Sequence, residues 1–540
     1  MTTNEIEQLN VNTDSDDLKP RPSDGDEKLK FKDTIPQIVA SCVINLPVIH
    51  AGINLSFSSI LIPQLTKPES DIQIDLDSAS LVASIVTVST ALGALVCGPL
   101  MDRYGRKRLS TIICIPFIFA WLLIALSRNL YMIYVARVLS GIAGGLVTVA
   151  LVYVSEISNP QYRGMLLCLN SISVSFGIIL TYFLNIFFSW RTMSFIFAFI
   201  AFITILIVMQ IPESPCWFVS LSRERSNSKA LASIEWIYRR RHLSTFYYHQ
   251  LINSEKLREA NIQVKTSTAD VGKRKSLVAK LVKVLKEPQV YKPLIILLFI
   301  FLFQQASGSY ILIFYTINIF RNLSSNFTER INENMALMLL GGLRLVVSVI
   351  ASGLSRKCHR KTLLYISSLG MMIFIFIAGI LVRNMDEFSN GRDFLNIQMP
   401  SNDSLKVNEI NIEYQQSGHQ QQQQEYKEVY LLISILCYIS FSSLGVMILP
   451  WTLISELFPI EVKGKMSGIL VLIAYNFMFF SVKFFPYSLN MYGMEVMFYL
   501  FAISSFAFCI FVHYFLPETY GKSLNDIQEY FTIKATQQRH

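Results

Sequence analysis

The sequence predicts an all-α membrane protein with about twelve transmembrane helices in two six-helix, pseudo-symmetric halves. Of its 540 residues, 52% are hydrophobic and only 16% are charged, whereas about 25% of a soluble domain is charged. Long apolar runs approach or exceed the ~20 residues that a helix needs to cross ~30 Å of hydrocarbon, and they lack the alternation of barrel strands. Motifs at the ends of these runs also recur in the second half of the chain.

Twelve apolar runs are long enough to be spans. They lie at 37–62, 80–101, 110–128, 131–154, 165–187, 192–211, 292–318, 333–355, 362–382, 429–450, 466–488 and 495–516. Because their number is even, both termini are expected on the same side of the membrane.

The charge of the connecting segments predicts which side that is. Residues 214–292 contain 16 Lys or Arg against 6 Asp or Glu, whereas residues 384–428 contain 8 acids against 3 bases. Basic loops stay in the cytoplasm, so the termini and the central segment are predicted to be cytoplasmic. A basic segment can also bind nucleic acid, but between twelve spans topology explains it, and no nucleic-acid partner is expected.

These boundaries divide the chain into five parts. They are a disordered cytoplasmic tail (1–36), a first six-helix bundle (37–213), a basic cytoplasmic linker with short helices (214–291), a second bundle (292–516) with an external loop (384–428), and a cytoplasmic tail (517–540). The first tail lacks the apolar core of a signal peptide. We expect a multi-pass protein of the plasma membrane that works as a monomer in the bilayer.

Sequence motifs exclude several other chemistries. The eight cysteines lie outside the predicted external loops and form no CxxC pair, so neither disulfides nor a zinc site is expected. The chain contains no GxxxxGK[ST] motif, so an ATP-driven pump is not expected. We expect no metal, no cofactor and no enzymatic activity. The external sequons begin at Asn322, Asn326 and Asn402 and predict glycosylation there.

The chain repeats itself at the predicted inner loops. GPLMDRYGRK at 98–107 has its counterpart in GLSRKCHRK at 353–361. Glu156 precedes Arg163-Gly164 by seven residues, as Glu456 precedes Lys463-Gly464. Such duplication is typical of transporters whose two bundles rock around a central site.

Charged residues gather at the predicted inner ends of the spans. They are Asp102, Arg103, Arg106, Arg137, Glu156, Arg163, Glu213, Arg360, Glu456, Lys463 and Glu518. They can be solvated loop charges, whose pairs contribute ~0–1 kcal/mol each, or a latch that closes the inner mouth in one state. Recurrence in both halves favours the latch. Arg137, which precedes a glycine-rich stretch, is expected to pair with an inner-face acid.

Six motifs follow one another in order along the chain. They are GPLMDRYGRK, YVSEISNPQYRG (153–164), PESPCWF (212–218), QQASGSYILIFY (304–315), PWTLISELFP (450–459) and PETYGKSL (517–524). This ordered set resembles the motifs of the sugar porter family of the major facilitator superfamily, over nearly the whole chain from span one to Leu524. The sequences AGINLSFSSILIPQL in span one and RGMLLCLNS in span five are most similar to the insect facilitated trehalose transporter group.

The resemblance implies roles for particular side chains. Gln304 and Gln305 would bond sugar hydroxyls, Tyr315 would belong to an outer gate, and Trp451 would stack on the sugar ring. From residue type alone, a glutamine pair in a span can equally join two helices. Glycine and proline in spans seven and ten would break those helices and so line a cavity.

The second half departs from the family pattern at several site positions. Tyr310 replaces an Asn, Arg344 occupies a polar position in span eight, and Asn476 lies beside Ala474-Tyr475, where Asn-Trp is common. Arg344 either faces an aqueous cavity, binding substrate or an acid, or lies near a span end. The candidate substrate-binding set is Gln304, Gln305, Tyr310, Tyr315, Arg344, Trp451 and Asn476.

The expected function is facilitated transport of a hexose or trehalose by alternating access. Proton-coupled relatives carry an Asp in span one where this chain has Asn54, which cannot exchange a proton, so a uniporter is favoured. His50 is either a packed neutral ring or a substitute relay. A proton-coupled symporter, a sugar sensor that does not transport, and a carrier of a non-sugar solute, such as an anion bound by Arg344, stay as alternatives.

Overall fold

The computed structural model describes residues 31–66, 71–222, 226–267, 287–315, 333–395, 426–458, 462–519 and 530–531. In these segments the chain is almost entirely helical. The first half contains η1 (Phe31–Thr34), α2 (Ile35–Ile44), α3 (Leu46–Leu65), α4 (Leu76–Tyr104), α5 (Arg106–Ala125), α6 (Leu130–Leu146), α7 (Val149–Ile157), α8 (Pro160–Phe187) and α9 (Trp190–Val208). The remainder contains α10 (Pro215–Ser220), α11 (Asn227–Tyr238), α12 (Arg241–Ser267), α14 (Pro288–Ala306), α15 (Ile311–Phe314), α18 (Glu333–Ser355), α19 (Arg360–Leu395), α21 (Leu449–Leu457) and α22 (Lys463–Phe515).

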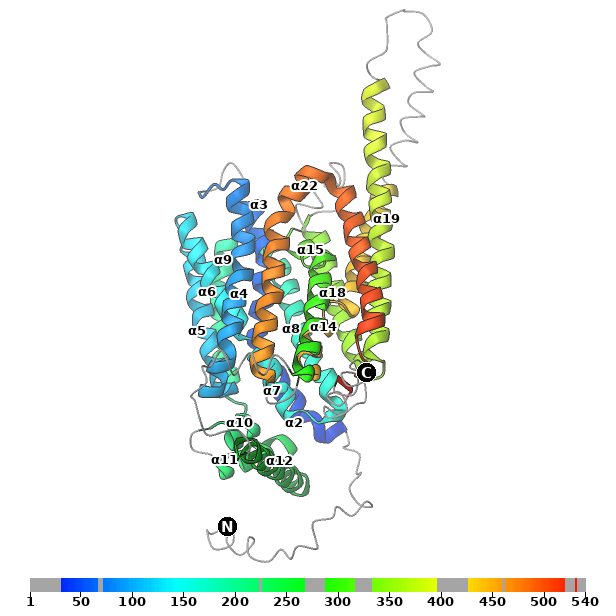
Figure 1. Cartoon of the computed structure of the whole chain (residues 1–540). Coiled ribbons are helices and arrows are strands. Elements are labelled where there is room, and N and C mark those ends of the chain that lie inside the picture. The colour runs from blue at the N-terminus through cyan, green and yellow to red at the C-terminus, as the bar shows by residue number, and fades with distance from the viewer. Residues whose placement is uncertain are drawn as a thin grey trace, which may run out of the picture.

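Within the described ranges, eleven helices are long and apolar enough to cross a membrane. One of them, Met466–Phe515, has 50 residues and is interrupted at Gly493, where φ is +76°. There α22 turns back on itself, so that it crosses the bundle twice (Figure 1). Ten single crossings and this double one make twelve, which confirms the predicted fold class.

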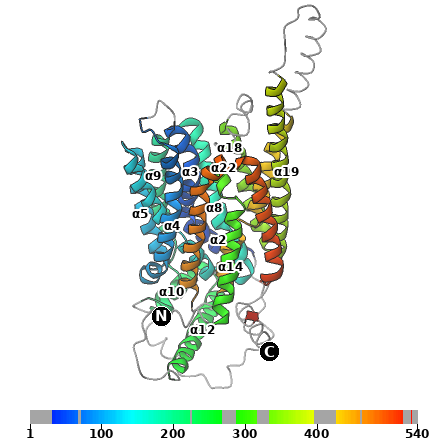
Figure 2. The ribbon, with the colours of Figure 1, turned by 45° about the horizontal axis from the view of Figure 1, so that its top comes forward.

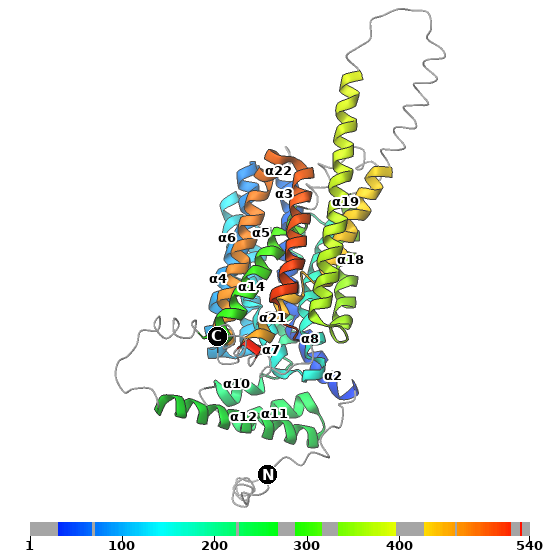
Figure 3. The same cartoon turned by 45° about the vertical axis from the view of Figure 1, so that its right-hand side comes forward.

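Helices α10 to α12 lie together beyond one end of the bundle (Figures 1 and 3). We call this end the linker face and the other end the opposite face. Figure 2 shows the crossing helices running side by side between the two faces. The two halves meet along two main seams, α4 against α22 and α8 against α18.

Glycines allow close helix approach inside the first half. A Cβ atom on Gly93 would overlap the Ile142 carbonyl oxygen, and one on Gly145 would overlap the Thr90 carbonyl oxygen. The backbones of α4 and α6 therefore touch directly, as the predicted role of the glycine-rich stretch requires.

Three spans are broken along their length, span four at Val147–Thr148, span seven at 307–310 and span ten at 445–448. The first span is Leu46–Leu65, and a turn at Asn45 separates it from the shorter helix α2. Broken backbone at membrane depth is tolerated where it lines a cavity. The breaks in spans seven and ten lie where glycine and proline predict them.

One helix continues further than its apolar run. We placed the ninth span at 362–382 and assigned 384–428 to an external loop, but α19 extends to Leu395. No proline interrupts residues 383–395, so the helical hydrogen bonds continue beyond the apolar segment.

Candidate functional site

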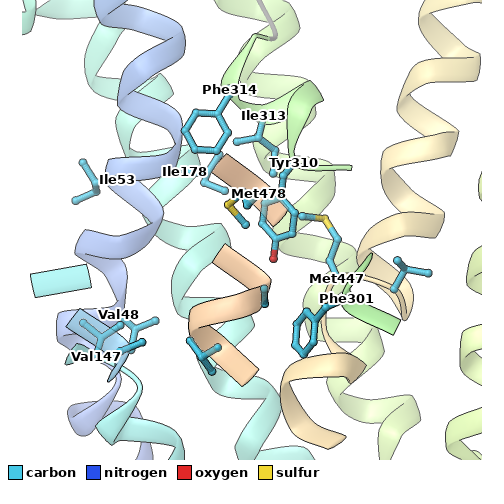
Figure 4. Packing of buried hydrophobic residues seen from close by; sticks show 14 of the residues in the cluster. Val48, Ile53, Val147, Ile178, Phe301, Tyr310, Ile313, Phe314, Met447 and Met478 are labelled. Carbon is cyan, nitrogen blue, oxygen red and sulfur yellow. The ribbon is translucent and has the colours of Figure 1, made fainter. Parts of the chain in front are cut away.

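A cavity of about 80 Å³ lies at the centre of the molecule, between the two halves. This is room for several water molecules, since one needs about 10–15 Å³ on the same measure. Its walls come from spans one, two, four and five of the first half and from seven, eight, ten and eleven of the second. In Figure 4 the Tyr310 ring and the Met447 side chain lie next to each other in this central region.

Three of the predicted substrate-binding residues line the cavity. They are Tyr310, Arg344 and Trp451. The Trp451 indole Nε1 donates to the Tyr310 hydroxyl at 3.2 Å. Tyr475 packs beside Trp451, with ring centroids 5.5 Å apart. The cavity therefore has an aromatic wall, whose ring faces suit the apolar side of a sugar.

Arg344 lies in the middle of α18, so it is not at a span end. Its side chain is 4% exposed and lines the cavity. Nε donates to the Ser175 hydroxyl at 3.2 Å, and Nη1 contacts the Met447 sulfur at 3.2 Å. The structure thus places a guanidinium on the cavity wall.

The other four predicted residues do not line the cavity. Gln304 Nε2 donates to the Val446 carbonyl oxygen at 2.6 Å, across to the break in span ten. The buried amide of Gln305 has no hydrogen-bond partner among the described residues. Tyr315 donates to the Val482 carbonyl oxygen at 3.1 Å, and the Asn476 amide bonds its own helix.

Sequence reasoning missed most of the polar lining. The missed residues are Asn54, Thr87, Thr90, Thr148, Asn170, Ser171, Thr452 and Tyr475. Their one available signal is spacing: polar side chains within apolar runs recur three or four residues apart, as Thr87 and Thr90 do. That spacing puts them on one helix face, but hydroxyls that bond their own helix backbone give the same pattern, as Thr90 does.

At the linker face the first half builds a charge cluster. Arg106 donates to the Glu156 carboxylate at 2.9 Å, and Ser214 donates to the same carboxylate. Glu213 accepts the backbone N–H groups of Arg106 and Lys107 at 2.8 and 2.9 Å, which caps α5. Asp102 adds an ion pair with Arg106 at 3.7 Å.

The second half repeats this arrangement. Arg360 donates to Glu456 at 3.1 Å, and Thr519 donates to the other oxygen of Glu456 at 2.8 Å. Glu518 accepts the backbone N–H groups of Arg360 and Lys361 at 3.0 and 3.1 Å, which caps α19. Each cluster joins helix ends within one half.

Contacts between the halves occur on both sides of the cavity. At the linker face, the Arg356 guanidinium lies 4.7 Å from the Tyr162 ring centroid, and Ser352 donates to the Met165 carbonyl oxygen at 3.1 Å. Arg360 also lies where a side chain on Gly164 would begin.

At the opposite face, Tyr487 donates to Asp77, and Asn185 donates to Asn334 at 2.8 Å. The two halves therefore contact each other at both the linker face and the opposite face in this structure.

Three predicted inner charges, Arg103, Arg137 and Arg163, do not join the clusters. Arg137 lies seven residues into α6, about 10 Å from the opposite-face end of that helix. It is buried and donates to Asn54 and Val82 carbonyl oxygens and to the Ser58 hydroxyl, not to an inner-face acid. Arg103 is exposed, and Arg163 Nη2 donates to the Ser158 carbonyl oxygen at 3.5 Å. The Lys463 side chain lies outside the described residues.

The remaining predictions concern His50, the glycosylation sites and a metal site. His50 is fully buried, stacks on Phe117 at 5.1 Å, and has no hydrogen-bond partner for either ring nitrogen in the described part of the chain. Asn322, Asn326 and Asn402 lie outside the described residues. Across the described ranges, no three His, Cys, Asp or Glu side chains gather as a metal site.

Two six-helix halves around an interfacial cavity define a membrane carrier of the major facilitator class. The proton:xylose symporter XylE bound to 6-bromo-6-deoxy-D-glucose has the same fold. Its TM-score is 0.69 at 18% identity, covering 92% of this chain and 100% of that one.

The family model "Sugar (and other) transporter" matches residues 58–396 and 415–531, so the chain belongs to the sugar transporter family. A relative in Culex quinquefasciatus, the facilitated trehalose transporter Tret1, is 27% identical over 92% of this chain and 86% of its own length. The Aedes aegypti protein of the same name is 26% identical over 91% of this chain, which spans about half, 54%, of that longer relative.

Proposed function

We propose that the protein is a facilitative sugar transporter, a uniporter for a hexose or trehalose that works by alternating access. The observation that carries this proposal is the polar and aromatic cavity between the halves, with inter-half contacts on both sides. In such a carrier, the halves rock so that one set of contacts opens while the other closes. The mosquito relatives are named facilitated trehalose transporters, which supports trehalose as a candidate.

The site residues would divide the work. Trp451 and Tyr310 would cover the ring of the sugar, and the amide and hydroxyl groups of Asn54, Thr87 and Thr90 would bond its hydroxyls. Gln304 and Gln305 lie outside the cavity lining, next to the break in span seven. We propose that they reach the sugar when that break rearranges.

The clusters around Arg106 and Arg360 would keep each half rigid during the rocking. Contacts between the halves, Arg356 on Tyr162 at one face and Tyr487 on Asp77 at the other, would alternate. We propose that the linker face is cytoplasmic, as the basic residues between spans six and seven indicate, and that the plasma membrane is the site of action.

Passive transport is supported by the groups near the cavity. Asn54, which lines it, does not ionise at physiological pH, and His50 stacks on Phe117 away from it. The alternative, a proton-coupled symporter, would need one of these positions to titrate.

Uptake into oocytes with verified surface expression tests the proposal. We expect saturable uptake of labelled glucose or trehalose that persists when the proton gradient is collapsed. Uptake that disappears with the gradient would replace the uniporter by a symporter. Binding without uptake would indicate a sugar sensor.

A further inference from the structure

Arg344 is the one charged residue among those found to line the central cavity. The rest of the polar lining consists of neutral hydroxyl, amide and aromatic groups, among them Asn54, Thr90 and Ser171. Apolar side chains such as Val48 and Leu167 complete the wall. A single positive charge therefore dominates the electrostatics of an otherwise neutral, largely apolar site.

The Arg344 guanidinium has few hydrogen-bond acceptors among the residues that the structure describes. Nε has a hydroxyl acceptor in Ser175, but Nη1 has only the Met447 sulfur, which is a weak acceptor. Nη2 donates no hydrogen bond to any residue that the structure describes. The two terminal nitrogens are the pair that grips a carboxylate in a bidentate arrangement, and here that pair is available to a ligand.

A counter-charge for Arg344 is also missing from the described residues. Its hydrogen-bond partners are Ser175 and Met447, it interacts electrostatically with Tyr310 and Tyr182, and none of these four residues is a carboxylate. Another buried cation, Arg137, donates to backbone carbonyls and a hydroxyl and stacks over Phe57, again without an acid in the described part. Uncompensated charge at membrane depth is costly, and a neutral sugar would leave that cost in place.

We propose that the substrate class of this cavity is a monoanionic sugar, a sugar carboxylate of the uronate type. Its carboxylate would accept from Nη1 and Nη2 of Arg344, its hydroxyls would bond the neutral polar lining, and its ring would lie against Trp451. One guanidinium matches one carboxylate, whereas a phosphate ester carries close to two charges at neutral pH. This inference rests on the proposed function, that of a sugar carrier, and replaces its neutral substrate by a sugar acid.

Binding to the purified full-length protein in detergent tests the inference directly. The probes are D-glucuronate, its neutral methyl ester, D-glucose and D-glucose 6-phosphate, titrated calorimetrically. Removing one member of a buried charge pair costs about 2 kcal/mol or more, which corresponds to a factor of about 30. We therefore expect D-glucuronate to bind at least about 30-fold more tightly than its methyl ester.

Three variants locate the effect. Arg344→Gln should abolish the preference for the acid over the ester, whereas Arg344→Lys, which keeps the charge, should retain part of it. Arg128→Gln removes a positive charge from an exposed position on the opposite face and should leave the preference unchanged. If Arg344→Gln fails to fold, the comparison of acid with ester on the wild-type protein still decides.

The inference is overturned if acid and ester bind equally, if the preference survives in Arg344→Gln, or if the phosphate ester binds more tightly than the uronate. Uptake of the same probes into proteoliposomes separates it from the proposed function. Glucose uptake without any uronate preference rejects the inference and keeps the carrier. Tight uronate binding without uptake keeps the inference and rejects the carrier, and no binding or uptake of any probe rejects both.

Discussion

At the scale of single residues, Gly308 controls the shape of the cavity wall. Its φ of +81° turns the chain between α14 and α15, and that turn brings Tyr310 to the cavity. A Cβ atom there would meet the Phe501 ring at 2.6 Å. Only glycine combines this dihedral angle with the close approach of an aromatic ring.

Gly308→Ala should lower the melting temperature of the purified protein. The left-handed conformation costs a side chain about 1–2 kcal/mol, and the clash with Phe501 adds to it. Gly493 has a similar φ of +76° but no atom within 4 Å of a Cβ. Gly493→Ala should therefore carry only the free-energy cost of the dihedral angle, without that of a clash. Gly353→Ala lies in a helix with no atom within 4 Å and is the neutral control. A Gly308→Ala protein as stable as this control would contradict the account.

The two adjacent glutamines differ in what they bond. Gln304 satisfies the Val446 carbonyl oxygen at a helix break, whereas the Gln305 amide has no partner in the described chain. The sequence left two roles open for this glutamine pair, sugar binding and joining two helices, and the structure gives the two residues different contacts. In this structure Gln304 joins two spans, whereas the buried Gln305 amide, which lies outside the cavity lining, has no partner among the described residues.

Gln304→Leu should lower the melting temperature without sugar, because an unpaired buried carbonyl costs about 1–3 kcal/mol. Gln305→Leu should leave that temperature nearly unchanged and reduce uptake by about tenfold, the equivalent of one lost hydrogen bond of about 1.4 kcal/mol. Thermal unfolding and uptake measured on both variants check whether Gln304 acts on stability and Gln305 on transport. Equal effects of the two substitutions on both readouts would reject it.

At the scale of elements, a glutamate caps the linker-face end of one helix in each half. Glu213 caps α5 and Glu518 caps α19, each through two or more backbone N–H groups. The cap in the first half needs Gly105, because a side chain at this position, with φ of +95°, would overlap the Glu213 carboxylate. Position 359 in the second half holds His, whose Nδ1 lies 4.0 Å from Glu518.

Glu213→Gln and Glu518→Gln should each destabilise the protein by about 1–2 kcal/mol. Each removes a charge that lies at a helix N-terminus and accepts charge-assisted hydrogen bonds. Thermal unfolding in detergent measures the loss. Glu235→Gln, at an exposed position of α11, is the matched control, and a loss equal to that control would show that the caps contribute nothing.

At the scale of the whole molecule, the halves are closed against each other on two faces. Tyr487 and Asp77 join α22 to α4 at the opposite face, and Arg356 and Tyr162 join the halves at the linker face. A two-state carrier opens one face while it closes the other. Weakening a contact between the halves at one face therefore shifts the population toward the state that is open at that face.

Tyr487→Phe should increase labelling of a cavity cysteine, Thr90→Cys, by an impermeant maleimide from the opposite face. The Tyr487 hydrogen bond to Asp77 joins the halves at that face, so its loss raises the population that is open there. Arg356→Gln should decrease the same labelling, because it favours opening at the linker face. Both are measured in a background without the eight native cysteines, with exposed Tyr492→Phe as control. Changes in the same direction for both variants would contradict reciprocal closure.

The sequence by itself determined the twelve spans, the repeat of two halves and the breaks at Gly308 and Gly445, because span length, motif recurrence and glycine position are properties of short segments. Only the tertiary structure decided that Tyr310, Arg344 and Trp451 share a cavity while Asn476 bonds its own helix, and that Arg137 lies away from the charge clusters. Which face of a span reaches the centre depends on how each helix is rotated against distant neighbours, and packing between spans far apart in the chain sets that rotation.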